Sequence, residues 1–348
     1  MGLAEIRELI KPVIKEVDLS YLSGKIVALD AFNALYQFLA AIRQPDGTPL
    51  KDSKGRITSH LSGLFYRNKN LIENGIKLIY VFDGRHPEFK KKEQELREEQ
   101  RKKMEEKYEI AKEAGEKNLK KYAEFTSKLD YNMIDEAKEL LKAMGVPYIQ
   151  APSEGEAEAA YLVKKNIADF VGSQDYDSLL FGGTRVVRNI TISGKRKIRG
   201  VEVNISPEII ELKDVLNYLN LNQEKLIILA LVVGTDYNPD GIKGIGIKKA
   251  YEIVKKYDDP EKIFNYINWD KYYDISWKEL EKFFLDPPVV DINKEDIKFG
   301  EIDEEKIRKI LIDNHDFSEE RVNKSIEELK KSYKQGSQKN LLSFFQNG

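Results

Sequence analysis

The stretches Lys25-Ile-Val-Ala-Leu-Asp30 and Lys77-Leu-Ile-Tyr-Val-Phe-Asp83 decide the fold of this chain. Each is a continuous apolar run that ends in an acid, and Asp169-Phe-Val-Gly-Ser-Gln-Asp175 repeats the pattern in a shorter form. Segments with helical periodicity separate the three runs. Continuous apolar strands that alternate with helices are typical of a parallel sheet buried on both faces. We therefore expect an α/β fold with a mainly parallel central sheet flanked by helices.

Weaker patterns extend this prediction along the chain. Residues 146–150 favour a further short strand, and Arg185–Ile190 with Val201–Ile205 favour an antiparallel hairpin at the edge of the sheet. Apolar periodicity predicts helices at about 31–43, 57–74, 133–144, 153–165, 206–219, 223–234, 247–256, 303–313 and 317–334.

Composition limits the class of protein. The 348 residues include no cysteine, which excludes disulfides and thiolate metal sites, and no apolar run approaches the ~20 residues that span a bilayer. The N-terminus has no apolar signal-peptide core, and Ile6 stands where an N-myristoylation motif has Ser or Thr. We expect a cytoplasmic protein without a membrane partner, and a nuclear one only in a eukaryotic source. The formal net charge of −2 argues against a nucleic-acid partner, unless acids gather in a pocket while bases line the contact surface.

Acids at the ends of predicted strands and helices form the candidate site. Ligand sites in parallel sheets lie at the carboxyl ends of the strands, and carboxylates there bind hard divalent cations. Hydrolysis of a phosphodiester needs an activated water, a stabilised leaving oxygen and neutralised phosphate charge, which two ions ~3.5–4 Å apart provide. The candidate metal ligands are Asp30, Asp83, Glu154, Glu156, Asp175, Asp177 and Asp236.

Each of these acids also has a purely structural explanation. An acid after a strand is often a helix cap or a turn residue, and Ser153-x-x-Glu156 satisfies a capping box. For any single acid the structural explanation is favoured. For all seven together it is not, because so many convergent carboxylates without a counter-ion would repel one another.

The segment 88–130 differs from the rest of the chain. It is dense in charged helix formers, Gly115 is its one break, and its apolar residues are too few for a buried face. A solvated pair of charged helices explains this composition. We favour a helical arch over the active site, within residues 84–132.

Five separated motifs carry more information than any single residue. They are Val-Phe-Asp83-Gly, Ala-Pro-Ser-Glu154-Gly-Glu156-Ala, Ser-Gln-Asp175-Tyr-Asp177, Gly-Thr-Asp236-Tyr and Gly241-Ile-Lys-Gly-Ile-Gly246. In order and spacing they resemble the flap endonuclease family of structure-specific 5′ nucleases, most closely its archaeal branch. The resemblance implies a magnesium-dependent 5′ flap endonuclease with possible 5′→3′ exonuclease activity, which removes flaps from branched DNA in replication and repair.

The resemblance also implies roles for individual residues in catalysis. One Mg2+ would be surrounded by Asp30, Asp83, Glu154 and Glu156 and the other by Asp175, Asp177 and Asp236, with Mn2+ as a substitute. Lys90 and Arg97 match arch bases that contact the scissile phosphate. Their spacing places both on one helical face, as contact with one phosphate requires.

Three residues near the start of the chain match DNA contacts of the family. Tyr36 matches an aromatic residue that stacks on an unpaired base, although its pattern alone favours a core position on the helix after Asp30. Arg43 matches a residue near the DNA bend. Gly2 matches an N-terminus that approaches the bent DNA.

A glycine-rich turn within about 223–256 resembles a helix–two-turn–helix, which grips duplex backbone and often bridges to it through K+. Glycines let the main chain approach phosphates, and helix N-termini favour anions. A plain turn between helices is the alternative, and Ile247 stands where the family usually has Pro. The expected phosphate contacts, which include the basic run 195–199, are Lys195, Arg196, Lys197, Lys243, Gly244, Gly246, Lys248 and Lys249.

Residues 335–348 are predicted to form a flexible tail after a single nuclease domain, 1–334. Gln338, Leu341, Phe344 and Phe345 resemble a clamp-binding box. On one helical turn its three apolar side chains would plug a hydrophobic pocket of a sliding clamp (PCNA). The alternative is a frayed terminus that packs on its own domain.

Two rival functions are weighed against the flap endonuclease. A non-catalytic scaffold that binds DNA junctions on the clamp is opposed by the presence of all seven acids. A repair incision enzyme of the same superfamily would carry a very long insertion, which the short interval between Asp83 and Glu154 argues against. We expect a monomer that acts on branched DNA.

Overall fold

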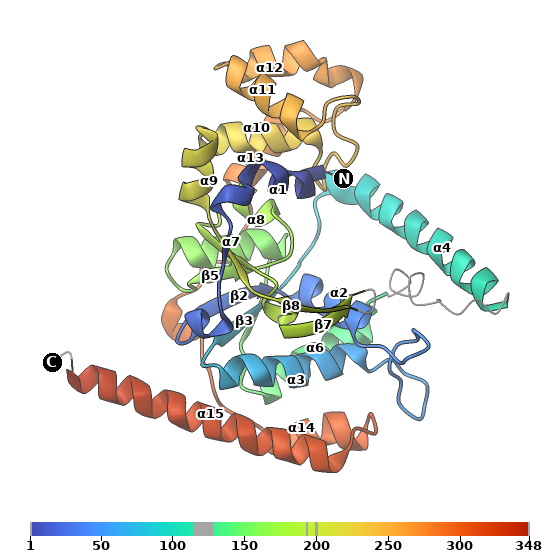
Figure 1. Cartoon of the computed structure of the whole chain (residues 1–348), viewed down its shortest axis with the longest axis vertical. Helices are drawn as coiled ribbons and strands as arrows, with labels where there is room; N and C mark the ends of the chain where they lie inside the picture. Colours follow the sequence, from blue (N-terminus) through green and yellow to red (C-terminus); the bar gives the residue numbers. More distant parts are fainter. Residues whose placement is uncertain (1, 114–127, 193, 199–200, 347–348) are drawn as a thin grey trace.

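The central element of the structure, a computed structural model, is a seven-stranded sheet (Figure 1). The described residues are 2–113, 128–192, 194–198 and 201–346. In spatial order the strands are β1 (Lys15–Glu16), β9 (Glu208–Glu211), β6 (Arg185–Arg188), β5 (Phe170–Gly172), β2 (Ile26–Asp30), β3 (Lys77–Phe82) and β4 (Tyr148–Gln150). The five strands from β6 to β4 are parallel, and β9 and β1 continue the sheet in antiparallel pairing. The expected mainly parallel α/β sheet is confirmed.

The strand register brings the predicted acids to one edge of the sheet. Asp30 pairs with Val81, and Leu29 pairs with Gly172. The strands β2, β3 and β5 therefore end side by side, and their carboxyl ends open on the same edge. Asp83 and the residues that follow Gly172 leave the sheet at this edge.

Helices cover both faces of the sheet because alternate strand residues point to opposite cores. Ala28 and Val81 belong to the core shared with α7 (Gly155–Lys164) and α10 (Gln223–Val233). Leu29 and Tyr80 belong to the core shared with the helices α2 (Ala31–Ala41), α3 (Ser59–Glu73) and α6 (Tyr131–Ala143). Figure 1 shows these two layers above and below the strands.

The remaining helices extend the two layers. α10 is buried along most of its length, which explains its lack of a polar face. Apart from further short 3-10 turns, the other described helices are η1 (Gly2–Ile6), α1 (Arg7–Ile10), η4 (Glu88–Lys90), α4 (Lys91–Glu113), α8 (Asp177–Leu180), α9 (Leu212–Leu219), α11 (Ile247–Lys256), α12 (Pro260–Ile267), α13 (Trp277–Leu285), α14 (Glu304–Arg308), a π-helical turn (Lys309–Asp313) and α15 (Glu319–Gln346). Among the described residues, no helix combines the length and the apolar character that crossing a bilayer requires.

The predicted hairpin of 185–190 with 201–205 is wrong in its pairing. β8 (Val201–Ile205) pairs with β7 (Gly194–Ile198) in a separate two-stranded sheet. β6 lies inside the main sheet and pairs with β9, which the helix predicted at 206–219 included. The physical reason is that Ile209 and Ile210 face opposite cores, so this short segment is buried on both faces as a strand.

The expected arch and tail are only partly described. α4 accounts for the first half of the arch, and residues 114–127 lie outside the described residues. α15 continues past residue 335 to Gln346 without a break in the helix. The division into a domain and a tail at this point stays a prediction.

A buried histidine ties the loop between α2 and α3 to the turn before α15. His315 Nδ1 lies 3.0 Å from Asp52 Oδ2, and His315 Nε2 lies 3.0 Å from Glu136 Oε1. The Ser53 amide also donates to Asp316 Oδ2 at 2.8 Å. The hydrogen bond to Glu136 raises the pKa of His315, and the same bond lowers the pKa of Glu136 to about 2. When it is protonated, His315 is therefore an ionic cross-link between this loop, α6 and the turn before α15.

His315→Asn is expected to cost more stability at pH 6 than at pH 9. Because the folded-state pKa of His315 is raised, its stabilisation is complete below the ordinary histidine pKa and is lost as pH rises through the folded value. Urea denaturation of both proteins at the two pH values measures the difference in unfolding free energy. Glu139→Gln, on the exposed side of α6, is the control whose effect stays constant between these pH values. An equal cost of His315→Asn at both pH values would refute the ionic cross-link.

Candidate active site

Backbone hydrogen bonds fix the first acids at the edge of the sheet. Asp30 ends β2 and caps α2, with its Oδ1 accepting from the Asn33 amide at 3.0 Å. Asp83 follows β3 and accepts from the Gly155 amide at 2.6 Å, which joins it to the start of α7. Glu154 is the N-cap residue of α7. The carboxylates at the ends of β2 and β3 and at the start of α7 therefore lie close together at this edge of the sheet.

The other acids come from the loop after β5 and from the end of α10. Asp175 lies in that loop and accepts from the Asn33 side chain at 2.8 Å, and Asp177 begins α8. Asp236 follows α10, which ends at Gly234 with a φ of 117°. This left-handed backbone favours glycine, because an L side chain would be strained there.

The seven carboxylates interact as one group. Burial raises the pKa of Asp177 well above its ordinary value, and the charges of Asp236 and Asp175 raise it further. Burial and the charges of Asp177, Asp175 and Asp30 do the same to the pKa of Glu156. Burial and the nearby Asp83 and Asp175 also raise the pKa of Asp30 well above its ordinary value. The structure therefore brings together the acids that the strand-end pattern selected, in a site that requires positive charge.

The capping-box explanation of Glu156 does not apply in the structure. The N-cap position of α7 is Glu154 and not Ser153. Glu156 accepts from Ser173 Oγ at 2.6 Å, and burial is the largest cause of its raised pKa. A half-buried carboxylate whose neighbours are other acids is poorly explained as a helix cap.

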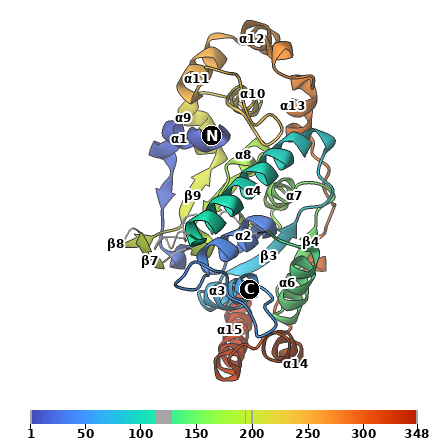
Figure 2. The same cartoon turned by 90° about the vertical axis from the view of Figure 1, so that its right-hand side faces the viewer.

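Lys90 and Arg97 place positive charge beside the acids. Lys90 Nζ is buried, lies 2.6 Å from Glu154 Oε2 and lies 3.4 Å from Asp236 Oδ2. Arg97 Nη2 lies 3.1 Å from Asp236 Oδ2, and most of its side chain is exposed. Both come from the segment that leads into and forms α4, which crosses in front of the molecule in Figure 2 and projects away from it in Figure 1.

His86 lies in the same site and was not among the residues predicted from the sequence. Its Nδ1 is 3.3 Å from Glu154 Oε1. Among the described residues, Asp83, His86 and Glu154 are the group whose ligand atoms all lie within 4.8 Å of one another in a geometry suited to a metal ion. Its position three residues after Asp83, on the turn that leaves β3, is the signal that could have identified it.

A network around Arg188 holds the loop that carries Asp175 and Asp177. Arg188 Nε donates to the Gln174 carbonyl at 3.0 Å, and its Nη1 donates to the Tyr176 hydroxyl at 2.7 Å. The same nitrogen donates to Glu208 Oε2 at 3.0 Å, and Arg7 binds Glu208 through two bonds of 2.7 Å. Arg188 is also one of the charges that lower the pKa of Asp175 against the effect of burial. Nothing in the local sequence of β6 or β9 indicated this network.

The motifs imply a metal-dependent flap endonuclease, and on that expectation Arg188→Met lowers the cleavage rate by about 10- to 100-fold, the usual effect of losing a group that orients metal ligands. The physical reason is that the backbone of Gln174 and the hydroxyl of Tyr176 lose their shared donor. Single-turnover rates measured over a range of Mg2+ concentrations would show a higher half-saturating concentration. Arg185→Met on the same strand is the control and keeps the wild-type Mg2+ dependence. An unchanged Mg2+ dependence in Arg188→Met would exclude a positioning role.

The two predicted DNA contacts near α2 have different surroundings. Tyr36 is 44% exposed, so the core position that its pattern favoured is wrong. Arg43 Nη1 donates to the Gly47 carbonyl at 2.9 Å within its own loop. Base stacking by Tyr36 and a DNA contact by Arg43 stay predictions.

The turn between α10 and α11 presents its lysines to solvent. Lys243, Lys248 and Lys249 are exposed, whereas Ile247 is buried at the start of α11. Gly244 has a φ of 83°, and Gly246 is the N-cap residue of α11. Ile247 thus anchors the turn by packing into the core, at the position where the resemblance would place Pro.

Several of the predicted contact residues have side chains that the structure does not describe. Gly2 belongs to η1. Among the predicted contact residues, the structure does not describe the side chains of Lys195, Arg196 and Lys197 on β7, or of Gln338, Leu341, Phe344 and Phe345 on α15.

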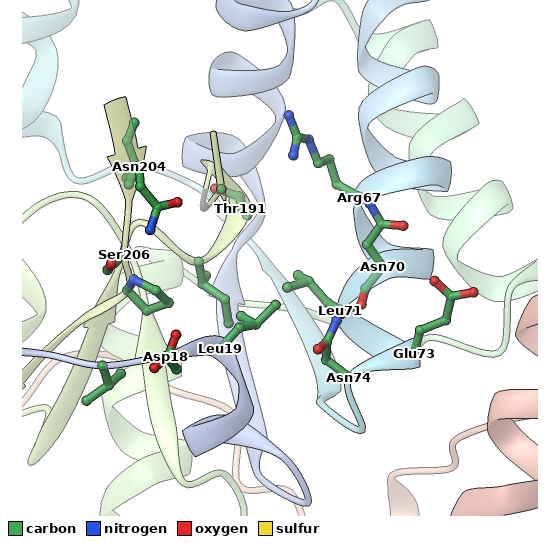
Figure 3. A pocket seen from close by; sticks show the side chains of 15 residues that line it. Asp18, Leu19, Arg67, Asn70, Leu71, Glu73, Asn74, Thr191, Asn204 and Ser206 are labelled. Carbon is green, nitrogen blue, oxygen red and sulfur yellow. Dashed lines mark hydrogen bonds between the residues drawn. The ribbon is translucent and has the colours of Figure 1, made fainter. Parts of the chain in front are cut away.

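A separate cavity of about 370 Å³ contains none of the seven acids. It lies between the end of α3 and the strand β8, and Arg67, Asn70, Asn74 and Asn204 are among its lining residues (Figure 3). Its mixture of amides and opposite charges favours no particular reaction. The acids, and not this cavity, are the candidate active site.

Comparison with known proteins agrees with this geometry. Residues 1–104 match the XPG N-terminal domain, and residues 145–236 match the XPG I-region. The chain is 54% identical over 344 residues to flap endonuclease 1 of Nanoarchaeum equitans, with 98% of each chain covered. It is 55% identical over 334 residues to flap endonuclease 1 of Pyrococcus furiosus, with 95% of this chain and 96% of that protein covered.

The similarity extends to solved structures. Flap endonuclease-1 from Methanococcus jannaschii superposes with a TM-score of 0.73 at 40% identity, over 92% of this chain and 96% of that one. The catalytic core of Rad2 shares the fold, with a TM-score of 0.68 at 24% identity over 93% of this chain and 99% of that one.

The fold and the matched regions define a structure-specific 5′ nuclease, a hydrolase that acts on DNA phosphodiester bonds. The chain belongs to the flap endonuclease 1 family, and these relatives are archaeal, as the motifs indicated. Membership identifies a metal-dependent 5′ flap endonuclease with a place in DNA replication and repair.

Proposed function

We propose that the seven carboxylates hold two Mg2+ ions and that this site hydrolyses the phosphodiester at the base of a 5′ flap on branched DNA. The donor set fits such ions, because Mg2+ prefers carboxylate oxygens and water. The observation that carries the proposal is the convergence of seven carboxylates, several of whose pKa values are raised by desolvation and by the neighbouring negative charges. Asp30, Asp83, Glu154 and Glu156 would surround one ion, and Asp175, Asp177 and Asp236 the other. Mn2+ is the expected substitute.

When bound, the two ions supply a nucleophile at neutral pH and charge stabilisation for the attacking and leaving oxygens. Basic residues of the chain then position the scissile phosphate and neutralise part of its charge. Lys90, whose ammonium faces the carboxylates, donates to a non-bridging oxygen of the scissile phosphate. Arg97 adds a second donor from the exposed side of α4. Their contacts with Glu154 and Asp236 support this role, because both cations lie beside carboxylates of the proposed metal site.

The substrate is held by surfaces outside the carboxylate cluster. The exposed Lys243, Lys248 and Lys249 surround a helix N-terminus at Gly246, and such a terminus favours phosphate oxygens. We place duplex backbone there, with K+ as a possible bridging cation. The exposed Tyr36, on the helix that Asp30 caps, would stack on the base that unpairs next to the cleaved phosphate.

The C-terminal motif supports a proposal for the protein partner of the enzyme. Gln338, Leu341, Phe344 and Phe345 would dock on a sliding clamp of the PCNA type. We propose a cytoplasmic monomer that meets branched DNA on this clamp.

A radiolabelled double-flap DNA with Mg2+ tests the proposal. We expect one incision near the base of the 5′ flap, no cutting after chelation of the metal, and weak cutting of the matching unbranched duplex. Equal cutting of branched and unbranched DNA would contradict structure specificity. Undiminished cutting in the presence of a chelator would contradict the role of the ions.

A further inference from the structure

We propose that His86 supplies a nitrogen ligand to the metal ion held by Asp83 and Glu154. This inference rests on the proposed function, because it concerns one of the same two ions. The imidazole of His86 adds a nitrogen ligand to the seven carboxylates, which offer oxygen ligands alone. The class of ligand that such a site selects is a divalent transition-metal ion, of which Mn2+ is the test case.

The spacing of the three side chains suits a shared ion. His86 Nδ1 lies 3.3 Å from Glu154 Oε1, and the ligand atoms of Asp83, His86 and Glu154 all lie within 4.8 Å of one another. Two ligands that each lie ~2.1 Å from one ion are separated by about 3.0 Å in octahedral geometry and about 3.4 Å in tetrahedral geometry. The distance from His86 to Glu154 falls within this interval, whereas it is long for a hydrogen bond.

The two oxygens of Glu154 face different partners. Oε2 lies 2.6 Å from Lys90 Nζ, while Oε1 lies nearest to His86. A carboxylate arranged in this way can keep its contact with Lys90 and offer Oε1 to an ion shared with His86. Asp83 is fixed by its bond from the Gly155 amide, so the oxygen side of the site is already oriented.

His86 is placed where its side chain can reach such an ion without a change in the fold. Its side chain is 32% exposed and lies on the turn between Asp83 and η4, flanked by Arg85 and Pro87. Imidazole binds Mn2+ and other transition metals more readily than Mg2+, which prefers oxygen. His86 is therefore expected to shift the preference of this one site toward Mn2+ without changing the set of carboxylates.

Electron spin echo envelope modulation of Mn2+ bound to the DNA-free protein tests the proposal. Wild-type protein is expected to show modulation from a directly coordinated 14N, and protein labelled with 15N-histidine is expected to show the corresponding change in frequency. His86→Ala loses the nitrogen signal and keeps bound Mn2+. Arg85→Ala, which removes the exposed neighbouring side chain, keeps the signal.

Calorimetry gives a second readout that does not depend on activity. His86→Ala is expected to weaken Mn2+ binding about tenfold, the lower end of what an altered ligand environment costs, and to change Mg2+ binding less. Bound Mn2+ without nitrogen modulation in the wild-type protein would overturn the role of His86 and leave the carboxylate site standing. Failure of the protein to bind any divalent ion would overturn both. The labelled wild-type protein gives an answer even if His86→Ala does not fold.

Discussion

Asp177→Asn is expected to lower the single-turnover rate of flap cleavage by roughly 10³-fold, because a correctly held ion supplies several kcal/mol of transition-state stabilisation. Asp177 begins α8 and lies half-buried among the other acids, and desolvation together with their charges raises its pKa. Asparagine has nearly the same shape as aspartate and removes the charge. Rapid-quench assays of a labelled double-flap DNA at saturating Mg2+ measure this loss.

The same variant should gain stability when no metal is present. The pKa of Asp177 is raised in the folded protein, so ionisation of this group favours the unfolded state once pH exceeds its ordinary value. Asp177→Asn removes that cost, and at neutral pH its metal-free melting temperature should exceed that of the wild type. Mg2+ should stabilise the wild type and have much less effect on the variant. Lower metal-free stability of the variant, together with undiminished stabilisation by Mg2+, would refute the assignment of Asp177 to a metal site.

A remote acid separates these effects from a general change in net charge. Glu252 is exposed on α11, away from the seven acids. Glu252→Gln removes the same charge and should keep both the cleavage rate and the stabilisation by Mg2+. A loss of cleavage in this control equal to that in Asp177→Asn would mean that net charge, and not the site, is responsible.

The acid positions were predictable because strand ends leave a clear sequence signal. Apolar runs end at Asp30 and Asp83, and the parallel register of β2 with β3 brings the two ends together. The alternating cores on either side of these strands follow from the same runs. Asp236 follows a helix and not a strand. No periodic pattern distinguishes it from any other acid after a helix, and only the motif around it identified it.

The errors concern short segments whose structure is decided by distant partners. Glu208–Glu211 is a strand because it pairs with β6 on one edge and β1 on the other, and four residues carry too little periodicity to indicate this. Arg188 and Glu208 contact each other across that pairing, and Arg7 joins them from the N-terminal helix. Such a network is invisible in a sequence because its members share no spacing.

The positions of site residues outside the core were the hardest to predict from the sequence. Tyr36 lies on α2 among apolar residues, and a helical pattern cannot say which side of a wide apolar stripe faces solvent. His86 lies on an irregular turn, where position is set by tertiary contacts with Glu154 and not by periodicity. Both positions became interpretable only when the neighbouring elements were placed.

Lys90→Met is expected to lower the cleavage rate by about 10²- to 10³-fold, the effect of removing one preorganised donor from a site of developing charge. Burial opposes the charged form of Lys90, but Glu154 and Asp236 outweigh it and raise the pKa above its ordinary value. The ammonium is therefore charged throughout the working pH range. Methionine has a similar length and no charge, and single-turnover cleavage of the double-flap DNA measures the loss. Lys91→Met, on an adjacent side chain that is 79% exposed, is the matched control and should cleave normally.

Metal binding distinguishes this role of Lys90 from that of a ligand-orienting residue. Lys90 Nζ lies 2.6 Å from Glu154 Oε2 and 3.4 Å from Asp236 Oδ2, so it partly neutralises the carboxylates that the ions would bind. Removing this cation makes the site more negative, and Lys90→Met should bind Mg2+ at least as tightly as the wild type while cleavage falls. Calorimetric titration with Mg2+ in the absence of DNA measures the affinity. If affinity and cleavage fell together and high Mg2+ restored the rate, Lys90 would act by arranging Glu154 and not by contacting the phosphate.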